Sequence, residues 1–409
     1  MEVAVIGGGA AGLMAAYAAA SGGATVTLFE RNEKCGKKIY ITGKGRCNVT
    51  NDCEPSEYLR HVVRGGKFLT SSVYSFSPRD LMDMLERGGL KLKTERGNRV
   101  FPVSDKASDV TKCLENYCKN AGVHFKFNER ILKLNILNST MRGIITENNE
   151  FYFDKVIICT GGLSYPSTGS TGDGYRFAEQ AGHGIVSPVP SLCGVNLCGN
   201  YYKPMQGLAL KNVAIKIFRC GKKTDDLFGE MQFTHFGASG PIILTASALI
   251  CREPADDIKL ELDFKPALSF EQLEARLLRD FKENQNRDIS NCLKALLPLS
   301  AIEPLLSRCN IQPTKKVNSV TKSERSALLT NLKNFDMLFS SLRGFEEAVV
   351  TSGGVSLKEI NPKTMESKLV KGLYFCGEVL DCDAFTGGFN LQIAFSTGYA
   401  AGCAAAKTD

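Results

Sequence analysis

The first thirty residues limit the possible folds most strongly, because a strand, a glycine turn and a helix follow one another in a fixed order. Residues 2–6 are a short, mostly apolar run, as a buried parallel strand requires. The turn GGGAAG follows at 7–12, and residues 13–20 have helical composition. This order of strand, G-x-G-x-x-G and helix predicts a Rossmann-type unit that binds a dinucleotide.

The three motif glycines have separate expected roles. Gly7 permits the tight turn, Gly9 lets a pyrophosphate approach the backbone, and Gly12 lets the helix pack close to the strand. A second strand over 24–29 ends in Glu30, 18 residues beyond Gly12, where a carboxylate is expected to bind a ribose hydroxyl. The alternative is a tight turn without a ligand. The agreement of strand, helix and carboxylate favours the dinucleotide.

The segment after Glu30 favours FAD over NAD. Residues 35–51, CGKKIYITGKGRCNVTN, are glycine-rich and basic, and a nicotinamide dehydrogenase needs no such segment there. In an FAD protein the extended flavin passes this point. Glycines would let the backbone approach it, and Lys37, Lys38 and Arg46 would offset its phosphate charge. The alternative is a solvated basic loop.

Two later segments are predicted to return to the flavin. A strand over 155–159 ends in T-G-G at 160–162, similar to the A-T-G-G turn of many FAD proteins. A last strand over 372–376 leads to G-E at 377–378, and the glycine pair at 387–388 then opens a helix. The N–H groups at such a helix start can stabilise negative charge on the pyrimidine edge of a reduced flavin.

Together these motifs resemble a family of bacterial FAD proteins described as NAD(P)/FAD-dependent oxidoreductases with an inserted domain. The resemblance runs along the whole chain, and TGKGRCNVTN at 42–51 is its most characteristic segment. It implies a Rossmann-like α/β fold, FAD as cofactor, and NADH or NADPH as electron donor. The resemblance implies FAD contacts at Ala11, Glu30, Lys37, Lys38, Gly45, the backbone of Ile131, Glu378, Asn390 and Leu391. The motifs add Gly7, Gly9, Gly12, Arg31, Thr42, Gly43, Arg46, Thr160, Gly161, Gly377, Asp381 and Gly388.

The same resemblance suggests the chemistry. The family includes a reductase of conjugated 3-oxo bile acids and an aminoacetone oxidase. It therefore implies first an NAD(P)H-driven enzyme that acts on CH–CH bonds and reduces an activated C=C of a 3-oxo bile acid or steroid-like enone. The alternative is a flavin amine oxidase that makes peroxide from a small amine such as aminoacetone. A non-catalytic FAD-binding regulator is a third possibility, and the residues leave all three open.

Two residues outside the cofactor motifs are candidate proton donors. Tyr165 follows the T-G-G turn, and a phenol can protonate the carbanion that forms when an enone accepts hydride. His235 lies in the glycine-rich segment FTHFGASGP, and an imidazole can donate a proton or stabilise an oxyanion. A structural tyrosine and a structural histidine are the alternatives. Arg46 is a further candidate, as a bidentate ligand for a substrate carboxylate.

Pro188 and Pro190 indicate a domain boundary. Residues 1–190 and 345–409 are predicted to form a discontinuous FAD-binding domain, and 191–344 an inserted substrate domain, β-rich over 191–266 and helical over 267–334. The expected strands of the insert lie at 194–197, 208–218, 230–233 and 258–263; residues 347–350 then lead back through Ser352-Gly353-Gly354 to the flavin domain.

Composition restricts the partners. The net charge of +7 is small for 409 residues and dispersed, so we expect a small-molecule substrate and no nucleic acid. The 15 cysteines include no C-x-x-C pair and there are four histidines, so no metal site is predicted. A start that enters a strand at once, no long apolar run, and many unpaired cysteines predict a cytoplasmic protein without membrane association. The oligomeric state stays open.

Overall fold

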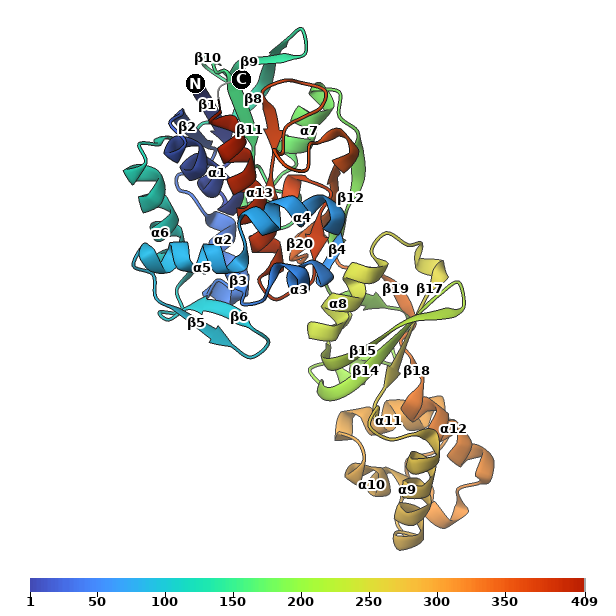
Figure 1. The fold of residues 1–409 in the computed structure, drawn as a ribbon. Coiled ribbons are helices and arrows are strands. Elements are labelled where there is room, and N and C mark those ends of the chain that lie inside the picture. The colour runs from blue at the N-terminus through green and yellow to red at the C-terminus, as the bar shows by residue number, and fades with distance from the viewer. Residues whose placement is uncertain (408–409) are drawn as a thin grey trace. The chain divides into compact units, whose positions relative to one another are not determined.

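The computed structural model describes residues 1–407 (Figure 1). The chain forms two compact units, the first made of Met1–Ser191 and Phe345–Asp409, and the second of Leu192–Gly344. The first unit thus contains every cofactor residue named above, and the second contains His235.

A five-stranded parallel sheet forms the centre of the first unit, in the order β21-β11-β1-β2-β7. β1 (Glu2–Ile6) is central and pairs with β2 (Thr25–Glu30) and β11 (Lys155–Ile158). β21 (Leu373–Phe375) and β7 (His124–Phe127) extend the sheet on either side. Because the strands are parallel, their carboxyl ends lie at one edge of the sheet.

Helix α1 (Ala10–Ser21) begins inside the glycine turn, three residues earlier than the composition suggested, and packs against α13 (Phe389–Ala405). Small residues permit this close approach. A Cβ at Gly398 would lie 2.4 Å from the Ala11 carbonyl oxygen, and one at Gly402 would lie 2.3 Å from that of Ala15. Ala11 therefore serves the packing of the two helices.

The other elements of the first unit surround this sheet (Figure 1). They are α2 (Lys37–Ile41), β3 (Thr50–Asn51), α3 (Pro55–Arg60), β4 (Val62–Arg64), α4 (Gly66–Ser75), α5 (Pro78–Arg87), β5 (Leu92–Glu95), β6 (Arg99–Pro102), α6 (Ala107–Asn120), β8 (Ile131–Leu137), β9 (Thr140–Thr146), β10 (Glu150–Tyr152), α7 (Asp173–Gln180), β12 (Ile185–Ser191), β20 (Val350–Val355) and β22 (Asp383–Ala384).

The segment that leads back from the insert contains a strand that the sequence analysis did not predict. β20 spans Val350–Val355, and the supposed connector Ser352-Gly353-Gly354 lies inside it, fully buried. The glycines permit close backbone contacts here. A Cβ at Gly353 would lie 2.5 Å from the Ser187 carbonyl oxygen of β12, with which β20 pairs antiparallel.

The second unit contains a seven-stranded sheet in the order β18-β17-β14-β15-β16-β13-β19. Its strands are β13 (Val195–Leu197), β14 (Ala209–Arg219), β15 (Lys222–Phe233), β16 (Gly237–Ser239), β17 (Ile258–Asp263), β18 (Phe335–Asp336) and β19 (Phe339–Leu342). Its helices are α8 (Pro241–Ile250), α9 (Phe270–Glu283), α10 (Ile289–Cys292), α11 (Leu299–Arg308) and α12 (Lys322–Lys333).

Two features of this unit differ from the prediction. β15 begins at Lys222, eight residues before the expected strand, because it pairs along almost its whole length with β14. Helix α8 was not predicted, because its sequence PIILTASALI has no charged face and so no helical periodicity. Within residues 1–407, no helix is long and apolar enough to cross a bilayer.

Candidate cofactor site

The carboxyl ends of four neighbouring strands bring the predicted cofactor segments together. β1 leads into the glycine turn, β2 ends in Glu30, β11 leads to Thr160, and β21 leads to Gly377 and Glu378. Open α/β sheets bind their ligands at this edge.

The three motif glycines differ in what surrounds them. Gly7 has a φ of +103°, and a Cβ there would lie 2.6 Å from the Cys159 carbonyl oxygen. A Cβ at Gly12 would lie 1.8 Å from the Gly7 carbonyl oxygen. At Gly9 a Cβ would meet nothing within 4 Å. The protein's own packing therefore requires Gly7 and Gly12, whereas Gly9 faces open space of the kind that a phosphate needs.

Glu30 is held at the end of β2 by its own neighbours. Its Oε2 accepts from the Gly8 N–H at 2.8 Å, and its Oε1 accepts from the Asn32 N–H at 2.9 Å. A carboxylate offers about four acceptor positions, so capacity remains for a hydroxyl donor. Arg31 turns away and pairs with Asp173 of α7 at 3.2 Å.

Lys38 and Glu378 form an ion pair across the site. The Lys38 ammonium also donates to Ser164 Oγ at 2.5 Å. The Glu378 carboxylate accepts from Ser164 Oγ at 2.8 Å and from the Thr351 N–H at 2.8 Å. Burial alone would raise the pKa of Glu378, but Lys38 and these hydrogen bonds hold that pKa below its usual range. The carboxylate is therefore ionised at neutral pH. No spacing in the sequence indicated Ser164 or Thr351.

The other two basic residues that were expected to offset phosphate charge, Lys37 and Arg46, have partners in the protein itself. Lys37 pairs with Glu33 at 2.8 Å. Arg46 donates from Nε to Asp105 at 2.7 Å, binds Glu95 through Nη2, and lies over the Phe101 ring at 4.2 Å. Two carboxylates of the protein thus take the place of the phosphate or substrate carboxylate expected at Arg46, which ties its segment to the β5–β6 hairpin.

The turn before Arg46 has a backbone conformation that would let a ligand approach closely. Gly43 and Gly45 have φ values of +56° and +84°, in the left-handed region that favours glycine. The Thr42 hydroxyl donates to the Ile39 carbonyl at 2.7 Å. The predicted Thr42 contact to the cofactor would therefore use the remaining lone pairs of that hydroxyl.

The same segment reaches the glycine pair before α13. Asn51 Nδ2 donates to the Gly387 carbonyl at 3.1 Å, and a Cβ at Gly388 would lie 2.3 Å from the Thr50 carbonyl oxygen. Segments that lie more than 330 residues apart in the sequence are thus adjacent. Because Gly388 has no side chain, the start of α13 can pack directly against the cofactor segment.

The residues that flank the glycine pair have mainly structural contacts. Asn390 Oδ1 accepts from the Ala384 N–H at 2.9 Å, and its Nδ2 donates to the Ala384 carbonyl at 2.8 Å. Asp381 donates its N–H to the Val355 carbonyl at 3.2 Å, and Leu391 is half-buried in the first turn of α13. A cofactor contact at Asn390 would therefore use the backbone.

The turns after β11 and β21 complete the edge. Gly161 and Gly377 have φ values of +73° and +77°. The Gly377 N–H donates to Thr397 Oγ1 at 2.9 Å, and a Cβ at Gly377 would lie 2.8 Å from that of Ala11. Ile131 is buried and begins β8.

Four buried polar atoms of the first unit have no hydrogen-bond partner among the described residues: Asn48 Oδ1, Thr160 Oγ1, the Tyr175 hydroxyl, and Ser191 Oγ at the end of β12. Leaving such an atom unpaired costs about 1–3 kcal/mol, so these atoms indicate a polar ligand. Asn48 and Thr160 belong to predicted flavin segments, whereas Tyr175 lies in α7 and was not predicted. The atoms of Asn48 and Thr160 and the space at Gly9 fit FAD.

The two candidate proton donors lie in different units. Tyr165 is half-buried in the first unit and has a φ of +51°, an uncommon backbone conformation for an aromatic residue. His235 is exposed between β15 and β16 of the second unit. Its ring lies edge-to-face with the Phe236 ring, and the two ring centroids are 5.0 Å apart. Both assignments stay predictions.

The sheet order, the glycine turn and the carboxylate at the end of β2 define a Rossmann-like FAD-binding domain. The family model described as "HI0933-like protein Rossmann domain" matches residues 1–404, and the chain belongs to this family. It is therefore an FAD-dependent oxidoreductase by family.

Curated relatives align over nearly the whole chain. The 3-dehydro-bile acid delta(4,6)-reductase of Clostridium scindens is 30% identical, over 99% of both chains. The ribosomal RNA dihydrouridine synthases of Haemophilus influenzae and Escherichia coli are 28% and 29% identical, over 97% of this chain and 96% of theirs. A solved 3-ketosteroid-delta4-(5alpha)-dehydrogenase from Rhodococcus jostii RHA1 shares the fold, with a TM-score of 0.55 and 16% identity over 100% of this chain and 97% of that chain.

Proposed function

We propose that this protein is a flavin-dependent reductase of a C=C bond conjugated to a carbonyl, with NADH or NADPH as electron donor. The observation that carries the proposal is the chemistry shared by its relatives. One is named a delta(4,6)-reductase of a 3-dehydro bile acid, and two are named synthases of dihydrouridine. A 3-oxo enone and the uracil ring both contain a C=C conjugated to a carbonyl, and reduction of each adds hydride at one carbon and a proton at the other.

A 3-oxo bile acid or steroid-like enone is the first candidate substrate. The bile-acid relative covers 99% of this chain at 30% identity, and such a substrate agrees with the expectation of a small molecule. Tyr165 and His235 are the proposed sources of the proton that the carbon next to the carbonyl receives.

A uracil base in ribosomal RNA is the second candidate, favoured by the distribution of charge. Residues 192–344 contain 21 Lys and Arg against 16 Asp and Glu, so five of the seven excess positive charges lie in the second unit. This concentration weakens the earlier inference that the charge is too dispersed for a polyanion.

FAD, when bound, supplies the hydride transfer. The chain's own residues would hold it. Gly9 would leave room for the pyrophosphate, Glu30 would accept from a ribose hydroxyl, and the N–H groups at the start of α13 would donate to the flavin ring. The ionised Glu378, fixed by Lys38, adds a hydrogen-bond acceptor at the same edge.

The test is an anaerobic visible spectrum of the FAD-loaded protein. NADH or NADPH should bleach the flavin band, and a 3-oxo-Δ4 steroid or bile acid should restore it, with product that has gained two hydrogens. A ribosomal RNA fragment is tested in parallel, and its reoxidation of the flavin would support the second candidate. Bleaching by a small amine, followed by reoxidation in air with peroxide formation, would overturn the proposal in favour of the amine oxidase.

A further inference from the structure

A second polar cluster in the first unit joins His183 to two residues of the connection between β20 and β21, Glu359 and Ser367. Ser367 Oγ lies 2.8 Å from His183 Nε2, and His183 Nδ1 lies 3.1 Å from Glu359 Oε2. His183 follows α7, Glu359 follows β20, and Ser367 precedes β21. The cluster is therefore at the amino end of β21, whereas the cofactor segments follow the carboxyl ends of the strands.

The contacts of His183 fix its tautomer. Its side chain is fully buried, and Glu359 Oε2, which also accepts from the Gly184 N–H at 2.9 Å, faces Nδ1. Nδ1 therefore carries the proton that the carboxylate accepts, and Nε2 presents its lone pair to the Ser367 hydroxyl. Burial lowers the pKa of His183, which keeps the imidazole neutral at neutral pH. A neutral imidazole with a free lone pair is the form that a general base requires.

Two backbone N–H groups converge on the serine oxygen. The N–H groups of Leu369 and Val370 donate to Ser367 Oγ at 3.0 and 2.9 Å. When Oγ bonds to a carbonyl carbon, one of the lone pairs that accept from these donors becomes the new bond. The N–H group that is released in this way can donate to the adjacent oxygen on which negative charge develops, which is the task of an oxyanion hole.

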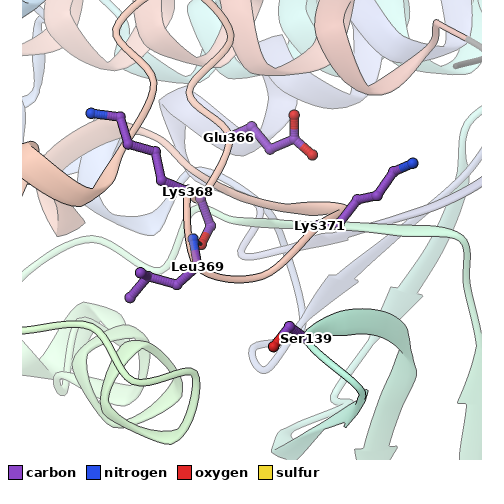
Figure 2. Close-up of a pocket in the computed structure, with 6 residues that line it drawn as sticks. Ser139, Glu366, Lys368, Leu369 and Lys371 are labelled. Carbon is purple, nitrogen blue, oxygen red and sulfur yellow. Dashed lines mark hydrogen bonds between the residues drawn. The ribbon is translucent and has the colours of Figure 1, made fainter.

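Ser367 also lines a shallow depression of about 450 Å³ that is open to solvent. Figure 2 shows the Lys368 and Lys371 side chains extending to opposite sides of it. Lys368 and Lys371 are exposed, and so is Leu369, at 41%. The lining also contains the Glu366 carboxylate, whose Oε1 accepts from the Gly372 N–H at 3.0 Å. Two lysines against one carboxylate, beside a small apolar surface, suit a small ester that is neutral or carries a negative charge.

We propose that Ser367, His183 and Glu359 form an acyl-transfer site that hydrolyses small carboxylic esters. Ser367 Oγ bonds to the ester carbonyl carbon while its proton passes to His183 Nε2. The C–O bond to the alcohol then breaks, and the departing oxygen takes that proton. Water attacks the acyl-serine with His183 again as base, which releases the carboxylic acid and restores the serine. No electrons are transferred, so the site is independent of the flavin.

The test uses the FAD-loaded wild-type protein with a biotinylated fluorophosphonate, followed by peptide mass spectrometry. The expected result is a single modified residue, Ser367. His183→Gln is expected to slow modification by roughly 10²–10⁴-fold. Ser356→Ala, a change in the same stretch of chain that leaves all three residues in place, should react like wild type.

Protein that keeps its flavin spectrum but is modified elsewhere, or not at all, would overturn the proposal and leave the cluster as a hydrogen-bonded clamp. Because wild-type protein gives this answer, the result does not depend on whether a variant folds. Hydrolysis of p-nitrophenyl acetate that disappears in Ser367→Ala would support the proposal. NADH or NADPH bleaching of the same samples reports the reductase separately.

Discussion

Each unit contains a lysine paired with a carboxylate away from solvent, and the two pairs differ in what remains available. In the first unit, Lys38 and Glu378 are 23% and 19% exposed. In the second, Lys333 and Asp263 are 2.7 Å apart and 7% and 5% exposed. The first pair lies at the edge where parallel strands end, whereas the second links α12 to β17.

The second pair has its bonding groups occupied. Lys333 Nζ also donates to the carbonyls of Lys265 and Leu268, at 3.1 and 2.6 Å. Asp263 Oδ1 accepts from the Lys265 N–H at 2.9 Å. This pair holds the helical part of the second unit to its sheet.

The first pair lies beside unmet bonding capacity. A Cβ at Gly161 would lie 3.9 Å from Glu378 Oε2, so the carboxylate faces the turn in which Thr160 Oγ1 has no partner. Burial alone therefore does not distinguish a structural ion pair from one that is available to a ligand. The unsatisfied groups beside the pair make that distinction.

We expect the largest effect from a side chain placed in the open space at Gly9, which tests whether the cofactor occupies that space. Gly9 has a φ of −81°, which any residue tolerates, so Gly9→Val should fold but lose FAD completely. The measurement is the ratio of flavin to protein absorbance, with circular dichroism as the check on folding. As a control, Gly12→Ala should lose the fold itself, because its Cβ has no room. Full flavin content in Gly9→Val would remove the pyrophosphate from this turn.

The next prediction concerns the Lys333–Asp263 pair, whose hydrogen-bonding groups are occupied. Lys333→Met leaves the buried Asp263 carboxylate with Lys216, at 3.8 Å, as its remaining cationic partner, and should destabilise the second unit by about 3 kcal/mol. Hydrogen exchange in α12 and β17 measures this. Flavin content should not change, and the double variant Lys333→Met/Asp263→Leu should recover much of the loss. If Lys333→Met lost as much FAD as Gly9→Val, the Lys333–Asp263 pair would not be purely structural.

We expect a smaller effect at the Lys38–Glu378 pair, which lies beside unmet hydrogen-bonding capacity. Glu378→Gln keeps the shape but removes the charge that accepts hydrogen bonds, and should weaken FAD binding by about 1.5–3 kcal/mol. The dissociation constant is measured by titrating apoprotein with FAD. Unchanged FAD affinity together with a large fall in unfolding free energy would make this pair structural, like the one in the second unit.

The smallest effect concerns pH. Burial lowers the pKa of His183 from its ordinary 6.5, so below that pH the unfolded chain binds a proton that the folded protein excludes. Stability should therefore fall as pH decreases through about 6.5. The Glu378 contribution, whose pKa is also lowered, should be lost only below 4.5. Thermal midpoints across this range test both, and His183→Gln should abolish the first decline. A midpoint independent of pH above 4.5 would contradict the burial argument.

The cofactor site was predictable where its parts are close in sequence. The turn from Gly7 to Gly12 and the carboxylate of Glu30 follow from short spacings, because backbone conformation and strand ends place them. The Rossmann-like order of the sheet follows from the same pattern.

The remaining parts depend on side chains that meet only in the folded chain. Lys38 and Glu378 are 340 residues apart, and no spacing relates them to Ser164. Arg46 has the composition of a phosphate ligand, but its carboxylate partners come from a hairpin that the sequence could not place beside it. Ester chemistry at Ser367 was likewise invisible, because the imidazole beside it comes from His183, 184 residues away in the connection between α7 and β12.

The strands at which the chain leaves and re-enters the first unit are paired with each other. Ser191 of β12 is opposite Val350 of β20, and within the second unit Val195 of β13 is opposite Leu342 of β19. In polymer terms, residues 192–344 are a loop whose ends are already closed, and each doubling of such a loop costs only about 0.6 kcal/mol. A lineage could therefore lengthen, trim or replace this module at little cost to the cofactor domain, so substrate preference can diverge while the flavin machinery is inherited intact.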